Sequence, residues 1–262
     1  MNSVPRATDY NVGAETYREL RRADPSIATE IRAALGDVRT VVNVGAGAGS
    51  YEPTDLDVTP VEPAQTLAGQ HPNRERVVRA RAERLPFPDD SFDAALAILT
   101  VHHWRDRMLG LSELRRVAKR RVVVITWDPH GPEFWLTRDY FPDMRKLDEQ
   151  IFPSINGGFA PLGTPKVTEL HVPHDCSDGF CGAYWRRPEA YLSPNVRSTI
   201  SSFGKLTDVD ARIKLLQSDL DSGGWHQRNR SLLPLDALDL GYRIVVSSEK
   251  PTNTSKPPQA RG

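Results

Sequence analysis

Short apolar runs separated by helical stretches leave this chain few possible folds. The runs cover residues 41–44, 58–61, 77–78, 92–99, 122–125, 167–172 and 242–246. Residues 108–118 read as a helix between two of them, because Leu111, Leu114 and Val117 share one helical face. Buried strands that alternate with helices are typical of a parallel sheet with helices on both faces. The sequence therefore predicts the α/β class.

The character of the chain changes on both sides of this pattern. Residues 14–35 have helical spacing that Pro25 divides, and the stretch after residue 128 is rich in Pro, Gly and aromatic residues. A long helical insertion beside a parallel sheet favours a lid. We expect a helical cap segment at 1–35, a core at 36–175 in which 129–165 contributes to the lid, a mostly helical substrate lid at 176–240, a final core strand at 241–249 and a disordered tail at 250–262.

Composition limits the partners. The 262 residues carry 34 Lys+Arg and 34 Asp+Glu, so the formal net charge is zero. Nucleic acids and anionic membranes attract an excess of basic residues, so we expect neither as a partner. The longest apolar stretch, residues 94–99, is far shorter than the ~20 residues that span a bilayer, and residues 1–9 lack a signal-peptide core. We expect a cytoplasmic protein of undetermined oligomeric state.

A glycine-rich turn follows the first apolar run directly. Gly45, Gly47 and Gly49 alternate with alanine there, and Glu62 ends the second run. Such glycines let a ligand approach bare backbone N–H groups, and an acid at that place accepts hydrogen bonds from ribose hydroxyls. The combination indicates an adenosine-bearing cofactor, with an ordinary glycine turn as the alternative. Ser50 stands where a nicotinamide-binding turn would have its last glycine, which favours a cofactor without a pyrophosphate.

Four blocks in order carry a family resemblance. They read VNVGAGAG at 42–49, VEP at 61–63, AERLPFPDDSFD at 82–93 and LSELRRV at 111–117. Together they resemble the class I S-adenosylmethionine-dependent methyltransferases, most closely the bacterial small-molecule enzymes of the ubiquinone-biosynthesis type (methyltransferase type 11). The resemblance covers residues 41–128 and implies a Rossmann-like, doubly wound, mostly parallel seven-stranded sheet with a helical lid. The implied cofactor is S-adenosyl-L-methionine.

The resemblance also implies which residues hold this cofactor. The glycine turn would wrap its methionyl part, Glu62 would hold the ribose diol, and the segment after residue 80 would touch adenine. At Arg81 the chain departs from the family, which commonly has an Asp there, and a guanidinium cannot accept a hydrogen bond from the adenine amino group. The expected cofactor residues are Gly45, Ala46, Gly47, Gly49, Glu62, Pro63, Arg81, Ala82, Glu83, Leu99, Thr100 and Tyr17.

Candidate proton acceptors follow the fourth and fifth apolar runs, where the carboxyl ends of parallel strands meet. His102 and His103 come just after residue 99, and Asp128 ends the fifth run. A histidine near neutral pH can take a proton from a hydroxyl, an amine or an activated carbon. The alternatives are that the histidines pack or bind backbone to shape the pocket, and that Asp128 caps a following helix.

Aromatic residues gather in or beside the expected lid. They would form an apolar wall for a planar substrate and exclude water from the site. The alternative is that most of them form the core of the lid. The expected substrate residues are Trp104, Trp127, Phe134, Trp135, Tyr184 and Trp185.

Two histidines and the only two cysteines of the chain lie close together, at His171, His174, Cys176 and Cys181. These residue types suit zinc, but their spacing matches no common zinc finger or ribbon. We therefore expect no metal and interpret residues 174–180 as a loop at the rim of the active site. Without secretory features, a disulfide framework is not expected either.

The residues and the resemblance together predict an enzyme that transfers a methyl group from S-adenosylmethionine to oxygen, nitrogen or carbon of a small organic molecule. One alternative is a catalytically silent protein that binds this cofactor and regulates or scaffolds a partner. A second is a nicotinamide-dependent oxidoreductase, which Ser50 and the lack of a Tyr-x-x-x-Lys pair disfavour. The Asn-Pro-Pro-Tyr type of signature of nucleic-acid methyltransferases is replaced by Thr-Val-His-His-Trp at 100–104.

Overall fold

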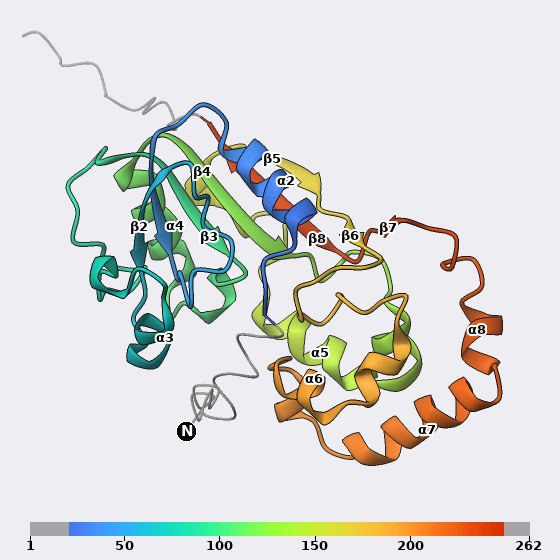
Figure 1. The fold of residues 1–262 in the computed structure, drawn as a ribbon. Coiled ribbons are helices and arrows are strands. Elements are labelled where there is room, and N and C mark those ends of the chain that lie inside the picture. The colour runs from blue at the N-terminus through green and yellow to red at the C-terminus, as the bar shows by residue number, and fades with distance from the viewer. Residues whose placement is uncertain (1–20, 249–262) are drawn as a thin grey trace, which may run out of the picture.

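The computed structural model describes residues 21–248. The prediction for Tyr17, most of the expected cap segment and the expected tail at 250–262 therefore lie outside the described residues. Within them, a sheet flanked by helices forms one part of the molecule, and a group of helices lies beyond one end of the sheet (Figure 1).

Six strands of the described residues form the main sheet. Four of them pair in parallel, whereas β8 runs antiparallel to both of its neighbours. The carboxyl ends of the parallel strands thus share one edge, which is where ligands bind in α/β sheets. In order across the sheet, the strands are β2 (Asp57–Val61), β1 (Thr40–Val44), β3 (Phe92–Ile98), β4 (Ala118–Trp127), β8 (Tyr242–Ser247) and β5 (Lys166–Glu169).

The seven-strand prediction is wrong by one strand. Residues 77–78 make only an isolated parallel bridge between Val61 and Val78, because two apolar residues are too few for a ladder. The apolar run predicted at 167–172 also forms two strands instead of one. Its first part belongs to β5, and its last residue belongs to a second strand outside the main sheet. There β6 (Val172–Pro173) and β7 (Ala237–Leu238) form a separate two-stranded sheet.

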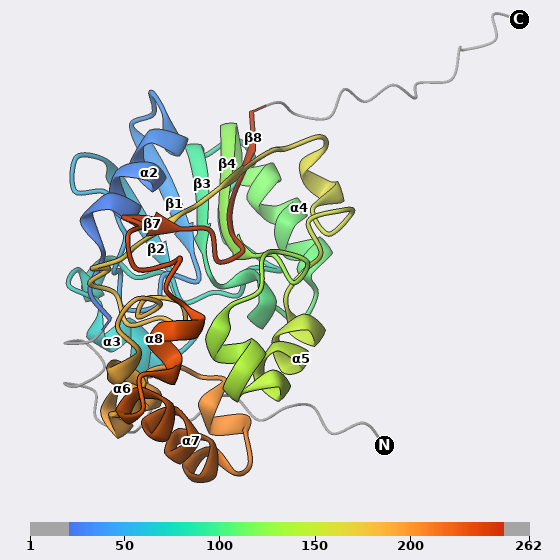
Figure 2. The same ribbon diagram turned by 90° about the vertical axis from the view of Figure 1, so that its right-hand side faces the viewer.

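Helices α2 (Pro25–Leu35) and α4 (Arg107–Val117) cover opposite faces of the main sheet (Figure 2). Successive side chains of β3 point to opposite faces of the sheet, so this strand contributes to the hydrophobic core on each face. Leu96 packs in the core under α2, whereas Ala95 and Ala97 pack in the core under α4. The α/β class and the mostly parallel sheet are therefore confirmed, with helices on both faces.

Beyond the carboxyl edge of the sheet lies a group of helices that we call the lid (Figures 1 and 2). Trp135, Trp185, Trp225 and Tyr191 form its core and are almost fully buried. The Trp135 ring meets those of Trp225 and Tyr191 edge to face, with centroids 5.2 and 5.7 Å apart. The lid helices are α5 (Pro142–Ile151), α6 (Pro194–Ser198), α7 (Val209–Asp221) and α8 (Gly224–Arg228), and the short α3 (Gln65–Gln70) follows β2 in the core.

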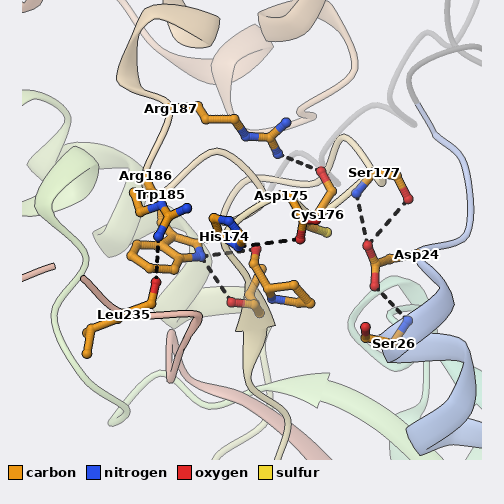
Figure 3. Close-up of polar contacts among 12 residues, drawn as sticks. Asp24, Ser26, His174, Asp175, Cys176, Ser177, Trp185, Arg186, Arg187 and Leu235 are labelled. Atoms are coloured by element: carbon orange, nitrogen blue, oxygen red, sulfur yellow. Dashed lines mark hydrogen bonds and ion pairs between the residues drawn. The ribbon is translucent and has the colours of Figure 1, made fainter. Parts of the chain in front are cut away.

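A buried polar cluster joins the lid to the chain around the glycine turn. Tyr51 donates to Asp178 Oδ2 at 3.0 Å, and Arg21 Nε donates to Asp178 Oδ1 at 2.7 Å. Asp24 caps α2 through Ser26 and also accepts from the Ser177 backbone N–H at 3.0 Å (Figure 3). Burial and the Asp178 carboxylate raise the pKa of Tyr51 well above its ordinary value, so its hydroxyl remains a donor.

Tyr51→Phe removes a hydrogen bond to a carboxylate whose side chain is only 1% exposed. Because a buried acceptor then loses a partner, we expect the free energy of unfolding in urea to fall by about 1–3 kcal/mol. Tyr140→Phe is the matched control, since its hydroxyl donates to Asp219, which is 33% exposed. The control should lose less than about 1 kcal/mol, and equal losses would contradict the role of the buried cluster.

Candidate active site

The glycine turn between β1 and β2 has a backbone that only glycine adopts readily. Gly45, Gly47 and Gly49 have φ of 75°, 55° and 79°, all in the left-handed region. A Cβ at Gly45 would lie 2.1 Å from Thr100 Oγ1, and one at Gly49 would lie 2.5 Å from His71 Nε2. At Gly47 no atom of residues 21–248 lies within 4 Å of that position. The turn is therefore closed against the protein on two sides and open at its centre.

Glu62 holds this turn from the end of β2. Its side chain is buried, and its Oε2 accepts from the Gly47 N–H at 2.9 Å while Oε1 accepts from the Ala64 N–H at 2.8 Å. The Val61 carbonyl accepts from Gly45 and Ala46 beside it. Each carboxylate oxygen keeps a free lone pair after these bonds, so Glu62 can still accept from two neighbouring hydroxyls.

A second carboxylate, Glu52, supports the turn through His71, and the sequence analysis did not predict it. Glu52 accepts from Asn43 Nδ2 and contacts His71 Nε2, each at 3.0 Å. The Asn73 N–H donates to His71 Nδ1, so the other ring nitrogen carries the hydrogen that bonds Glu52. His71 packs directly against Gly49. The one visible signal was Asn43, a buried amide within an otherwise apolar strand.

The segment expected at adenine has other partners. Glu83 Oε1 accepts from the backbone N–H groups of Arg105 and Asp106 at 2.7 and 3.2 Å, so it helps to begin α4. Ala82 is buried, and Arg81 is exposed. Pro63, also exposed, accepts from an Arg79 guanidinium through its carbonyl at 2.7 Å. The contacts of these residues with adenine or ribose stay predictions.

Leu99 directly follows β3 and has a strained backbone conformation. Its φ is 47°, which for a branched, non-glycine residue costs about 1–3 kcal/mol. The surrounding structure fixes it, because its N–H donates to the Ile125 carbonyl at 2.8 Å and the next residue, Thr100, is buried against Gly45. Thr100 therefore lies against the glycine turn, and Leu99 before it carries backbone strain of the kind often found at functional sites. The contact of either residue with the methionyl group stays a prediction.

His102 and His103 form a short 3-10 turn (Val101–His103) just after Leu99. The His102 ring lies between His103 and Phe152, with centroids 3.9 and 4.0 Å away, and its Nδ1 has no hydrogen-bond partner among the described residues. Burial lowers the pKa of both histidines, and the positive charge of Lys205 lowers each further. Both rings are therefore neutral at pH 7 and keep a lone pair for a proton, although each is a weaker base than free imidazole.

Asp128 follows β4 at the same edge of the sheet. Its Oδ1 accepts from the His130 N–H at 3.1 Å, so in the described residues the side chain closes a local turn. This is close to the capping alternative, and its catalytic role stays a prediction.

The predicted substrate aromatics fall into two groups. Trp127 is half-buried at the end of β4, where its ring contacts Phe152 edge to face at 5.4 Å. Trp104 packs against Gly110 of α4. The other four are buried in the lid core, and their contact with a substrate stays a prediction: Phe134, Trp135, Tyr184 and Trp185.

The lid also contains a recess of about 300 Å³ between α5 and α7. Phe141 forms part of its wall, and Lys146, Lys205 and Arg212 bring positive charge to it. Lys205 also acts electrostatically on His102. Lys205 is thus shared between the wall of the recess and the charged surroundings of the histidine turn.

The candidate metal ligands do not converge. Cys176 is buried near the Asp178 carbonyl, Cys181 Sγ lies 3.6 Å from Met144 Sδ, and His171 bonds Glu169. In residues 21–248 no group of three or more His, Cys, Asp or Glu side chains is placed to hold a metal ion. The loop after β6 instead contacts the start of α2 through Ser177 and Asp24, and Arg187 through the Cys176 carbonyl (Figure 3).

Gly47→Val places a side chain in the open centre of the turn, and we expect it to abolish binding of an adenosyl cofactor in calorimetric titration. Gly223→Val is the matched control, because Gly223 also has positive φ (75°) and open surroundings but lies between α7 and α8. Both variants should lose about 1–2 kcal/mol of stability from left-handed strain. Retained cofactor binding by Gly47→Val would remove the turn from the site.

Comparisons with known proteins agree with this geometry. Residues 38–126 match the model of a methyltransferase domain. A protein of known structure from Anabaena variabilis, described as a candidate methyltransferase of an antibiotic biosynthesis pathway, is 30% identical with a TM-score of 0.78. The match covers 88% of this chain and all of that one.

Curated relatives match shorter stretches. The rice chloroplastic 2-methyl-6-phytyl-1,4-hydroquinone methyltransferase 2 is 35% identical over 121 residues, which is 41% of this chain and 34% of the relative. The methyltransferase YcgJ of Bacillus subtilis, itself uncharacterised, is 28% identical over 155 residues, or 53% and 61% of the two chains. The match thus spans about a third of the rice protein. No helix in residues 21–248 is long and apolar enough to cross a membrane.

The full-length likeness to the Anabaena protein and the matched domain agree with the site. A cradle of left-handed glycines beside a buried acid at the end of β2 suits a nucleoside-bearing methyl donor. The chain belongs to the class I S-adenosylmethionine-dependent methyltransferases.

Proposed function

We propose that this protein transfers the methyl group of S-adenosylmethionine to a small organic molecule by in-line displacement. The observation that carries the proposal is the turn at Gly45, Gly47 and Gly49, open at its centre and joined to Glu62. The relatives support a small acceptor, since the name of the rice protein specifies a hydroquinone and the Anabaena protein is assigned to antibiotic biosynthesis. We propose a planar acceptor that carries a hydroxyl or an amine.

The residues proposed to hold the methyl donor each bind a different part of it. Glu62 would accept hydrogen bonds from the ribose hydroxyls, and the backbone of the glycine turn would hold the methionyl part. Thr100 closes the site beside Gly45, and Leu99 precedes it in the chain. The bound cofactor supplies a methyl group on a positively charged sulfur.

Positioning contributes more to this reaction than proton transfer does. Aligning an acceptor with a methyl group supplies about 7–11 kcal/mol, whereas a general base adds about 3–5 kcal/mol. The lid performs the first task, because its buried aromatic core gives it a fixed shape beyond the carboxyl edge of the sheet. It also excludes water, which competes for the acceptor's hydrogen-bonding positions.

Isothermal titration with S-adenosylmethionine and S-adenosylhomocysteine tests the proposal. We expect both to bind, and Glu62→Ala to weaken binding by about 1–3 kcal/mol, or roughly 5- to 150-fold, because charge-assisted hydrogen bonds are lost. Glu169→Ala, an exposed acid on β5, is the control and should bind as the parent does. Binding of neither compound would contradict the proposal.

A second measurement separates an enzyme from a silent binder. The protein is incubated with methyl-labelled cofactor and a panel of hydroquinones, catechols and aromatic amines, and products are detected by mass. We expect transfer to at least one class. Cofactor binding without transfer to any class would favour the regulatory or scaffold alternative.

A further inference from the structure

One carboxylate in the lid stands apart from the solvated acids around it. Asp148 lies on α5, four residues after the fully buried Met144, and thus on the same face of that helix. Its neighbours Asp143 and Glu149 are exposed and pair with Lys146 and Arg145. Asp148 is half-buried, and the Ser202 hydroxyl donates to its Oδ1 at 2.9 Å.

The surroundings of Asp148 come from both sides of the molecule. Lys205 and Ser202 approach from the lid, while Cys181 and Tyr242 lie within electrostatic range from the loop after β6 and from β8. Tyr242 pairs in register with Trp127, at the carboxyl end of β4. The carboxylate therefore lies where the lid meets the strand ends.

The end of α5 connects Asp148 to the predicted methyl-transfer site. The Phe152 N–H donates to the Asp148 backbone carbonyl, and the Phe152 ring lies 4.0 Å from that of His102 and 5.4 Å from that of Trp127. The positive charge of Lys205 lowers the pKa of Asp148, of His102 and of His103. One cluster of ionisable groups thus spans the lid and the turn after β3.

We propose that Asp148 is a catalytic residue that faces the methyl-transfer site from the lid, holds the hydroxyl or amine of the acceptor and takes its proton. The proposal rests on the proposed function. The acceptor's O–H or N–H bond breaks as its oxygen or nitrogen bonds to the methyl carbon. The carbon–sulfur bonding pair stays on sulfur, which becomes neutral, and the proton moves to Asp148 Oδ and then to water.

Asp148 suits this role better than the histidines. Burial raises the pKa of Asp148 to about 6, while the Ser202 hydroxyl and the Lys205 charge favour its ionised form. At pH 7 it is therefore a carboxylate that is more basic than an exposed acid. Burial also raises the pKa of Cys181 and Tyr242, so both stay uncharged near pH 6 and neither competes for the proton.

Proton release on cofactor binding tests the location of Asp148 without any acceptor. A sulfonium nearby should favour the carboxylate, so S-adenosylmethionine should displace a proton near pH 6, whereas the uncharged sulfur of S-adenosylhomocysteine should not. A one-unit fall in the pKa of Asp148 would release about 0.4 protons per site at pH 6. Titration calorimetry in buffers of different ionisation enthalpy measures this number for each compound.

Asp148→Asn should abolish the difference in proton release between S-adenosylmethionine and S-adenosylhomocysteine, while it keeps the affinity for S-adenosylhomocysteine. Glu149→Gln, its exposed neighbour on α5, should leave the difference intact. Ser202→Ala should move the pH of greatest release upward, because the carboxylate loses a donor that favours ionisation. The proposal would be overturned if Asp148→Asn kept the difference in proton release, or if the parent protein showed no such difference. Failure of the parent to bind either compound would count against the proposed function itself.

Stability gives an independent readout. Because the folded pKa of Asp148 is raised above its unfolded value of about 3.9, the parent should lose stability as pH rises from about 4 to 6. Asp148→Asn should therefore melt higher than the parent at pH 8, with a gap that narrows toward pH 4. A lower melting temperature for Asp148→Asn at pH 8 would show a purely structural carboxylate. With any acceptor that the parent methylates, the variant should lose turnover, and full turnover would equally refute the role.

Discussion

The left-handed backbone of the turn from Gly45 to Gly49 is the constraint on which the rest of the site depends. A side chain at either end would collide with Thr100 or His71, so the turn can lie against the ends of β3 and α3 only as glycine. A Cβ at the central Gly47 would meet no described atom within 4 Å, and Glu62 fixes this centre by accepting from the Gly47 N–H. A buried carboxylate thus both shapes the turn and remains able to bind hydroxyls.

The lid depends on this turn through contacts distant in sequence. Tyr51, two residues after the turn, bonds Asp178 of the lid, which also pairs with Arg21 at the start of the described chain. The residue pairs are separated by 127 and 157 positions. A change in the turn on cofactor binding would therefore reach the lid and the segment before α2 directly. Buried groups of this kind, fully paired, favour one arrangement of the three parts.

The sequence predicted what local pattern determines. Four parallel strands, β8 and α4 follow from apolar runs and helical spacing, and the glycine turn and Glu62 follow from their position after strands. The prediction of a strand at 77–78 was wrong because a run of two apolar residues is too short to show a periodicity. Asp148, Glu52 and Tyr51 were missed because their roles arise from partners far along the chain, and only an acid on the apolar face of α5 hinted at the first. For Glu83 the family resemblance implied a cofactor contact, whereas in the structure its side chain accepts from the backbone just before α4.

The most direct test of the central claim is an amide NMR titration of nitrogen-15-labelled protein with S-adenosylmethionine. The account predicts saturable shifts at Gly45, Gly47 and Gly49, with the greatest at Gly47, whose N–H bonds Glu62. The resonances of two positive-φ glycines elsewhere, Gly163 and Gly223, should not shift. Binding of the cofactor with the resonances of the turn unchanged would contradict the account.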